Sequence, residues 1–153
     1  MTGKYAILTA ACAALILGFA LGVSPALAQV AAIQSQELNA PGVSADLIEA
    51  TRSDGVLSVK VRLKNAGPKE ATLHFSLHKF ADKFYVQAES KKYFVLRDTE
   101  KVPLGDSVDY ARVKPGTSYT FWAKYPAPPA NIKKFSFYWP HGAPFDDVPI
   151  TDK

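Results

Sequence analysis

Residues 56–64 read VLSVKVRLK, and this stretch decides the fold class of the chain. From Leu57 to Lys64 apolar and polar residues alternate strictly, so that one face carries the apolar row Leu57, Val59, Val61 and Leu63. Alternation with a period of two predicts a β-strand with one face in the core and the other in water. We therefore expect a sheet that is covered by the core on one side only.

Similar segments lie on both sides of this strand and are separated by turn-forming residues. SDG at 53–55 and NAGP at 65–68 favour turns, because glycine accepts a positive φ. AESK at 88–91 suits a hairpin, and residues 98–114 indicate a long irregular connection. The strands we expect cover residues 43–51, 56–64, 70–77, 83–87, 92–97, 117–125 and 132–139.

About seven short strands with turns between them predict an all-β fold. The spacing favours an immunoglobulin-like antiparallel β-sandwich over residues 43–153. Residues 29–42 are expected to be a linker, in which a short helix would not be surprising. No sequence repeats at a fixed period, which argues against a propeller or a solenoid.

The first 28 residues have the three-part layout of a secretory signal peptide. Lys4 supplies a charge, an apolar run covers residues 6–23, and ALA at 26–28 ends the segment with small residues. We expect cleavage after residue 28, a periplasmic or secreted bacterial protein, and no stable membrane span after cleavage. A retained N-terminal anchor is one alternative, because the run is borderline in length for a span. Lipid attachment at Cys12 is the other.

Cysteine content and charge exclude several classes of function. Cys12 is the only cysteine of the 153 residues, so the 125 that remain after residue 28 have no disulfide, thiol nucleophile or thiolate ligand. Removal of Lys4 lowers the formal net charge from +4 to +3. The basic residues are spread along the expected strands rather than clustered, and we expect no nucleic-acid binding. We expect no cofactor.

The second half of the chain carries a series of four motifs: KYFVLRD at 92–98, VKPG at 113–116, FWAKYPAPPA at 121–130 and PFDDVPI at 144–150. With GVLSVKVRLKNAG at 55–67, this series resembles small exported β-sandwich domains that occur alone or ahead of peptidoglycan-binding OmpA-like domains in bacterial envelope proteins. The resemblance covers roughly residues 43–150 and implies an immunoglobulin-like envelope domain without assigned catalytic residues. Because the chain stops at Lys153, we expect no peptidoglycan-binding domain.

Three histidines are weak candidates for metal ligands. On an extended strand, four steps of about 3.3 Å would place His74 and His78 roughly 13 Å apart, too far to share one metal. We therefore expect both to be exposed strand residues. His141 is the third candidate, and after residue 28 neither Met nor Cys is present as a soft ligand for copper(I). We predict no metal site.

The acidic pair Asp146 and Asp147 does not predict a calcium site. Calcium takes 6 to 8 oxygen ligands, and the chain lacks the Asp-x-Asp-x-Asp-Gly series of a binding loop. A solvated pair in a proline-rich tail is the interpretation we favour. The chain also lacks the Gly-x-Ser-x-Gly turn that would hold a serine nucleophile, and we predict no catalytic residues.

Aromatic residues gather in the expected strands, and we expect most of them in the core. Trp122 and Tyr138 have the opposite parity to their neighbours Phe121 and Phe137. They either lie covered under a loop, which we favour, or form an exposed recognition patch. They are our candidate partner-binding residues.

These observations predict a non-enzymatic exported envelope protein that acts as an interaction or structural module. Its partner would be an unknown envelope protein or a glycan, bound at the sheet edges or at the face with Trp122 and Tyr138. A small-ligand or metal-binding periplasmic carrier that uses His74, His78 or His141 is the first alternative. A hydrolase with a site assembled from loops is the second.

Overall fold

The computed structural model describes residues 30–106 and 108–153. The expected signal peptide, with Cys12 and its cleavage site, lies outside these residues. Within them the chain forms eleven strands, one short α-helix and one 3-10 helix, so the all-β class predicted from the alternation is confirmed. No helix in the described ranges is long and apolar enough to cross a membrane.

The strands form three sheets. The elements in chain order are β1 (Gln34–Glu37), β2 (Val43–Ser53), β3 (Val56–Asn65), β4 (Ala71–His74), α1 (Leu77–Phe80), η1 (Ala81–Lys83), β5 (Tyr85–Ala88), β6 (Lys91–Phe94), β7 (Tyr110–Val113), β8 (Ser118–Pro126), β9 (Lys134–Tyr138), β10 (Phe145–Pro149) and β11 (Thr151–Asp152).

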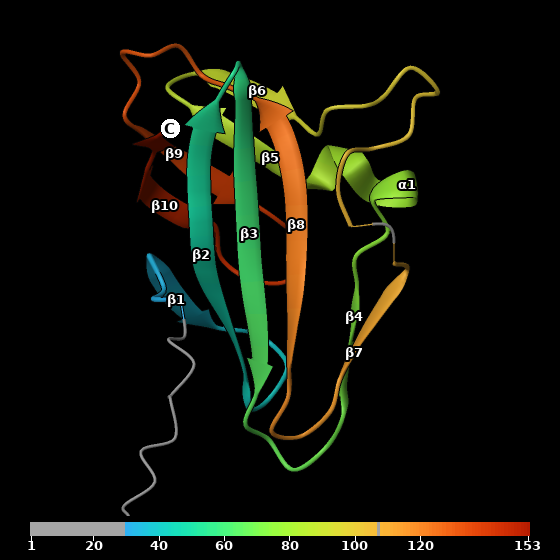
Figure 1. Ribbon diagram of the computed structural model, residues 1–153. Coiled ribbons are helices and arrows are strands. Elements are labelled where there is room, and N and C mark those ends of the chain that lie inside the picture. The colour runs from blue at the N-terminus through green and yellow to red at the C-terminus, as the bar shows by residue number, and fades with distance from the viewer. Residues whose placement is uncertain (1–29, 107) are drawn as a thin grey trace, which may run out of the picture.

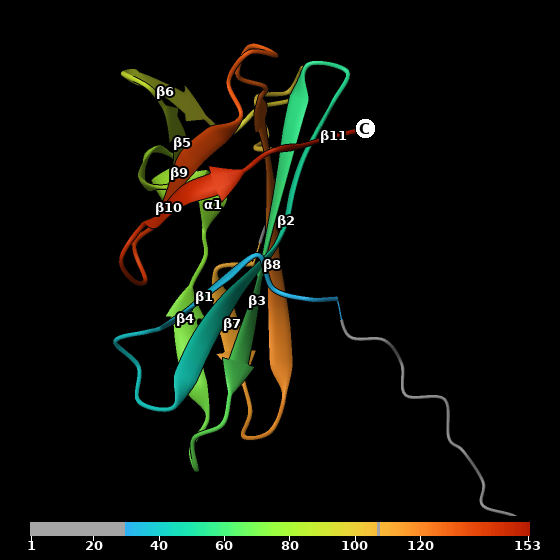
Figure 2. The same cartoon turned by 90° about the vertical axis from the view of Figure 1, so that its left-hand side faces the viewer.

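The larger sheet has the order β1-β2-β3-β8, and β11 also pairs with β2. A four-stranded sheet has the order β10-β9-β5-β6, and β4 pairs with β7. All pairs are antiparallel except β11–β2, which is parallel. The four-stranded sheet lies behind the upper part of β2, β3 and β8, and β4 and β7 lie beside the lower part (Figure 1). Seen from the side, β5, β9 and β10 form a second layer (Figure 2).

The row predicted from VLSVKVRLK lies in the core. All four of its side chains have no exposed surface, which confirms that prediction. The row packs in a core cluster with the inner residues of the four-stranded sheet, among them Val86 and Phe137. Burial of apolar area on both sheets therefore holds the two layers together. Each Å² of apolar surface removed from water stabilises the fold by about 25 cal/mol. The row consists of Leu57, Val59, Val61 and Leu63.

Two of the predicted turns are present. Asp54 and Gly55 join β2 to β3 with φ values of 51° and 76°, and two consecutive positive φ angles match the twist of an antiparallel hairpin. Glu89 and Ser90 join β5 to β6, with a φ of 54° at Glu89. The turn residues therefore set the strand register that the apolar pattern requires.

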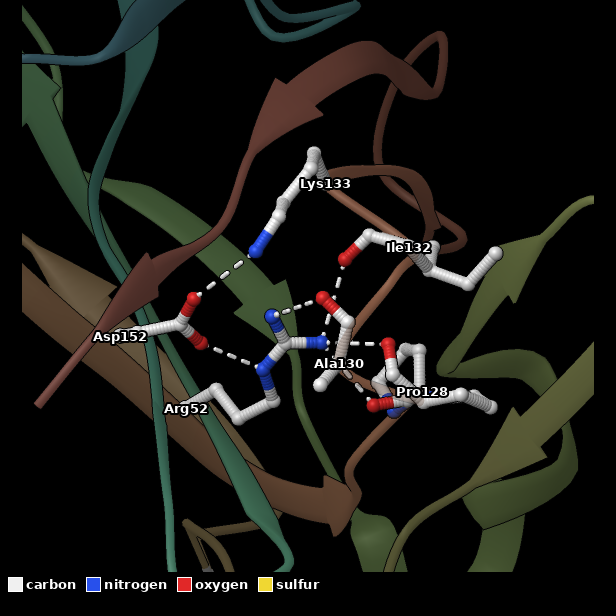
Figure 3. Close-up of polar contacts among 7 residues, drawn as sticks. Arg52, Pro128, Ala130, Ile132, Lys133 and Asp152 are labelled. Carbon is white, nitrogen blue, oxygen red and sulfur yellow. Dashed lines mark hydrogen bonds and ion pairs between the residues drawn. The ribbon is translucent and has the colours of Figure 1, made fainter.

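A bulge in β2 turns an arginine toward the core side. The register against β3 shifts between Leu47 and Glu49, so that Ala50 and Arg52, rather than Glu49 and Thr51, face inward. Arg52 is buried and donates to four backbone carbonyls of the β8–β9 connection and to Asp152 of β11 (Figure 3). The accepting carbonyls belong to Pro128, Pro129, Ala130 and Ile132.

The segment 29–42, expected to be a linker, contributes a strand to the larger sheet. β1 pairs with β2 from Gln34↔Leu47 to Glu37↔Ser44. Its sequence, QSQE, has no apolar alternation, so the periodicity could not reveal it. The strand forms because the edge of β2 offers unpaired backbone groups, and these groups require partners when buried.

The expected strand 70–77 is shorter than predicted. β4 ends at His74, and the chain then forms α1, whose first turn is closed by hydrogen bonds to the Ser76 carbonyl. The prediction that His74 and His78 share one strand is therefore wrong. β4 pairs with β7, whereas β5 pairs with β9. The chain must cross between these sheets, and the short helix makes this crossing.

Two segments expected to be irregular also contain strands. Residues 98–114 contain β7, and the tail after residue 139 contains β10 and β11. Each of these strands is at most five residues long, so the alternation signal is too short to recognise. Their partners on β4, β9 and β2 decide their conformation.

Residues 96–106 cover part of the free edge of β8. The amides of Leu96 and Asp106 donate to the carbonyls of Lys124 and Trp122, and the Lys124 amide donates to Leu104, each at 2.8 Å. An exposed sheet edge is a site for unwanted pairing with other chains. This connection therefore protects the part of β8 that carries Trp122.

Candidate functional site

The two candidate partner-binding residues lie on different surfaces. Trp122 is on β8 opposite Lys60, on the outer face of the larger sheet, and is 39% exposed. Tyr138 is on β9 opposite Tyr85, on the outer face of the four-stranded sheet, and is half-buried. The inner faces of the two sheets meet in the core, so these outer faces point away from each other. Trp122 and Tyr138 therefore cannot form one patch, and Trp122 is not covered by a loop.

Tyr138 belongs to a row of three aromatic side chains that we call the aromatic ledge. The ledge consists of Tyr85, Phe94 and Tyr138, which are direct neighbours across β6, β5 and β9. The Tyr85 and Tyr138 rings are parallel within 7°, with centroids 4.7 Å apart, and the Phe94 ring lies 5.9 Å from Tyr85. Such aromatic pairs contribute about 0.5–1.5 kcal/mol beyond their buried area.

Phe94 makes the ledge accessible from solvent. Its side chain is 49% exposed, although its place in an aromatic-rich strand predicted a core residue. The parity of β6 explains this difference, because Tyr93 occupies the inward position. Sequence periodicity could not decide between the two residues, since both are large and apolar.

One lysine lies against the ledge. Lys92 Nζ is 4.4 Å from the centre of the Tyr85 ring, and this cation–π contact is worth about 0.5–1 kcal/mol at an exposed site. Lys92 forms no ion pair with any residue in the described ranges. The ledge therefore has a positive charge beside its central ring.

A polar hollow continues the ledge along the same strands. Gln87 and Ser136 face each other two positions from Tyr85 and Tyr138, on the same outer face. Lys134 Nζ lies 3.9 Å from Oδ1 of Asp147 in this region. The hollow has a volume of about 150 Å³ and is lined by Gln87, Glu89, Lys134, Phe135, Ser136 and Asp147.

Asp146 and Asp147 lie in β10 rather than in an irregular tail, and both are exposed. The pairing of β10 with β9 is interrupted between Phe145 and Val148, and Asp147 has a φ of 53°. This bulge directs Asp147 toward Lys134. In the part of the chain that the structure describes, no group of three or more His, Cys, Asp or Glu side chains could hold a metal ion.

The structure brings together His74 and His141, not His74 and His78. The His141 ring donates from Nε2 to the backbone carbonyl of His74 at 2.6 Å. It also lies 4.6 Å from the Phe75 ring, and burial lowers its pKa. His78 is exposed on α1. The association of His74 with His141 joins residues 67 positions apart, which spacing alone could not indicate.

The two histidines line a second, apolar hollow of about 240 Å³. Lys83 Nζ lies 5.3 Å from the Phe80 ring at this site. The side chains come from β4, α1, η1 and the connection after β9. The lining residues are His74, Phe80, Lys83, Pro140 and His141.

No family model, curated protein or solved structure matches this chain.

Proposed function

We propose that this chain is an exported, non-enzymatic envelope protein that binds a partner through its aromatic ledge. The layout of residues 1–28 supports export and a bacterial periplasmic or secreted location. The absence of cysteine after residue 28 fits a domain stabilised by packing alone.

The order of the strands supports an immunoglobulin-like architecture. In such sandwiches the A, B and E strands share one sheet, and the C, F and G strands share the other, with C′ added in variable-type domains. Here β2, β3 and β8 form one layer, and β10-β9-β5-β6 form the other. In chain order the second set takes the places of G, F, C and C′, and we propose this correspondence.

The exposure of the ledge is the observation that carries the binding function. Three aromatic side chains lie in one row on the outer face of a sheet, where solvated strands usually carry polar residues. Exposed aromatic groups with polar surroundings are typical of interaction sites. The ledge has both features, because the polar hollow adjoins it.

Photo-crosslinking in intact cells tests this function. A photoreactive benzophenone residue would replace Phe94 on the ledge, and in a matched control it would replace Thr120 on the outer face of β8. We expect an adduct of the exported protein at position 94 and none at position 120. Equal adducts at both positions, or none at position 94, would reject binding through the ledge.

Carriage of a small ligand is a second candidate function, which the apolar hollow favours. Its walls combine the Phe80 ring with the imidazoles of His74 and His141, a combination typical of ligand sites. Native mass spectrometry of the protein purified from its own cells would reveal a bound compound. We expect the bound mass to disappear in His141→Gln but not in His78→Gln, and a spectrum of unliganded protein would reject this candidate.

A further inference from the structure

We infer that the occupant of the aromatic ledge is a sparsely anionic glycan, in which neutral sugar rings alternate with rings that carry a carboxylate. This inference rests on the proposed function and names the partner class for the same surface. The ledge and the polar hollow beside it form one continuous binding face on β5, β6 and β9.

The backbone of the two central strands of this face, β5 and β9, is not available to a partner. β5 pairs with both β6 and β9, and β9 pairs with both β5 and β10. A partner peptide therefore cannot add a strand beside either of the two central strands, which is the usual way in which sheets bind extended peptides. An occupant that lies across β5 and β9 must therefore be recognised by side chains that stand on the face.

The side chains along this face match the two kinds of surface on a sugar ring. Tyr85, Phe94 and Tyr138 offer apolar area for C–H groups. Gln87 and Ser136 both donate and accept hydrogen bonds, as sugar hydroxyls do. The aromatic row and the polar row are two residues apart on the same strands, so one extended chain of rings can contact both.

The charges of the face select a glycan with few carboxylates. Lys92 lies beside the ledge without an ion-pair partner in the described ranges and can receive one anionic group. In the polar hollow, Lys134 is already close to Asp147, and Glu89 adds a further negative charge. The aromatic end therefore attracts an anion and the polar end repels one. A densely charged polymer or an acidic peptide would place negative groups against both carboxylates.

Three soluble probes distinguish these chemistries. Hyaluronan hexasaccharide carries one carboxylate for every two rings. Fully N-acetylated chitohexaose (called chitohexaose below) is neutral, and poly-L-glutamate is a dense acidic peptide. We expect saturable binding in the order hyaluronan, then chitohexaose, with none for polyglutamate, measured by NMR titration of the full protein at physiological salt. Preference for polyglutamate would overturn the inference, as would the absence of binding to both sugars.

Matched variants locate the site. In Lys92→Gln, hyaluronan binding should weaken about 3- to 5-fold, as expected for one exposed charge pair, while chitohexaose binding stays unchanged. In Tyr138→Ala, both sugars should bind at least about 3-fold more weakly, and Tyr138→Phe should retain the ring contact. Trp122→Ala, on the opposite face, should leave the binding of both sugars unchanged. Thermal melts of each variant exclude unfolding as the cause, and an equal loss in Trp122→Ala would refute the assigned face.

The inference and the proposed function can fail separately. If neither sugar binds but the photoreactive residue at position 94 captures a protein, the glycan is wrong and the binding function stands. If position 94 gives no adduct and no probe binds, both are wrong.

Discussion

Arg52 in β2 donates from Nε to Oδ1 of Asp152 in β11 at 2.6 Å, although the two residues lie 100 positions apart (Figure 3). Lys133 Nζ lies 3.3 Å from the other oxygen of the same carboxylate. The Arg52 side chain is 9% exposed and also holds the proline-rich β8–β9 connection. One arginine therefore links the larger sheet, this connection and the C-terminal strand.

Replacement of Arg52 by Met should lower the free energy of unfolding by at least about 2 kcal/mol, because one buried and three part-buried carbonyls lose their donor. Urea denaturation measures this loss. Arg112→Met is the matched control, since Arg112 is exposed on β7, and its effect should stay within about 0.5 kcal/mol. Equal effects would show that the arginine contacts do not stabilise the fold.

Acid should weaken the Asp152 link within a defined pH range. The Arg52 guanidinium lowers the pKa of Asp152 from its ordinary 3.8 to about 2. A lowered carboxyl pKa adds stability above the unfolded-state value, and this stability is lost as the pH falls from about 4 toward 2. The free energy of unfolding, measured by denaturation at several pH values from 5 to 2, should therefore fall less steeply with decreasing pH for Asp152→Asn than for the native chain. Asp82→Asn, at an exposed acid in η1, should leave the slope as it is.

His141 should make the fold less stable in mildly acidic solution. Burial lowers its pKa below the ordinary 6.5, so the unfolded chain takes up a proton more readily than the folded chain. Stability should therefore decrease as the pH falls through about 6.5. Denaturant midpoints at pH 7.5 and pH 5.5 measure this difference, which should shrink in His141→Gln. An unchanged difference in that variant would contradict the role of His141, and His78→Gln serves as the control.

Two tyrosines on β8 should respond in opposite ways to removal of the hydroxyl. The Tyr125 hydroxyl is fully buried without a hydrogen-bond partner among the described residues, and burial raises its pKa. Tyr125→Phe should raise the free energy of unfolding by about 1 kcal/mol. The Tyr119 hydroxyl donates to the buried carboxylate of Asp106, so Tyr119→Phe should lower it by about 1 kcal/mol. Chemical denaturation measures both changes in the free energy of unfolding. Changes of the same sign in the two variants would contradict these roles of the hydroxyl groups.

Gly105 should not tolerate a side chain. A Cβ at this position would collide with the Leu77 side chain and lie 2.9 Å from the Trp122 carbonyl oxygen. Gly105→Ala should therefore lower the free energy of unfolding by about 1–3 kcal/mol through overpacking. Gly116→Ala, where the space is open but φ is +71°, should cost about 1 kcal/mol. Thermal denaturation compares the two, and a smaller loss at Gly105 would argue against the close approach of residues 96–106 to β8.

The amino-acid sequence by itself determined the long strands and the inward faces of β3 and β8. From Leu57 to Lys64 each apolar side chain alternates with a polar one, and only an extended conformation separates the two kinds onto opposite faces. The same rule identified the two faces of β8. Glycine and its neighbours identified the turn between β2 and β3, because the requirement for a positive φ is local.

Only the tertiary structure decided the short strands and the candidate sites. QSQE in β1 has no apolar pattern, and it is extended because the edge of β2 supplies its hydrogen bonds. The aromatic ledge depends on the register that places Phe94, Tyr85 and Tyr138 side by side. His141 reaches His74 only through the packing of separate sheets. Local residue patterns report which face of a strand is buried, whereas the pairing of strands distant in sequence determines which exposed side chains meet.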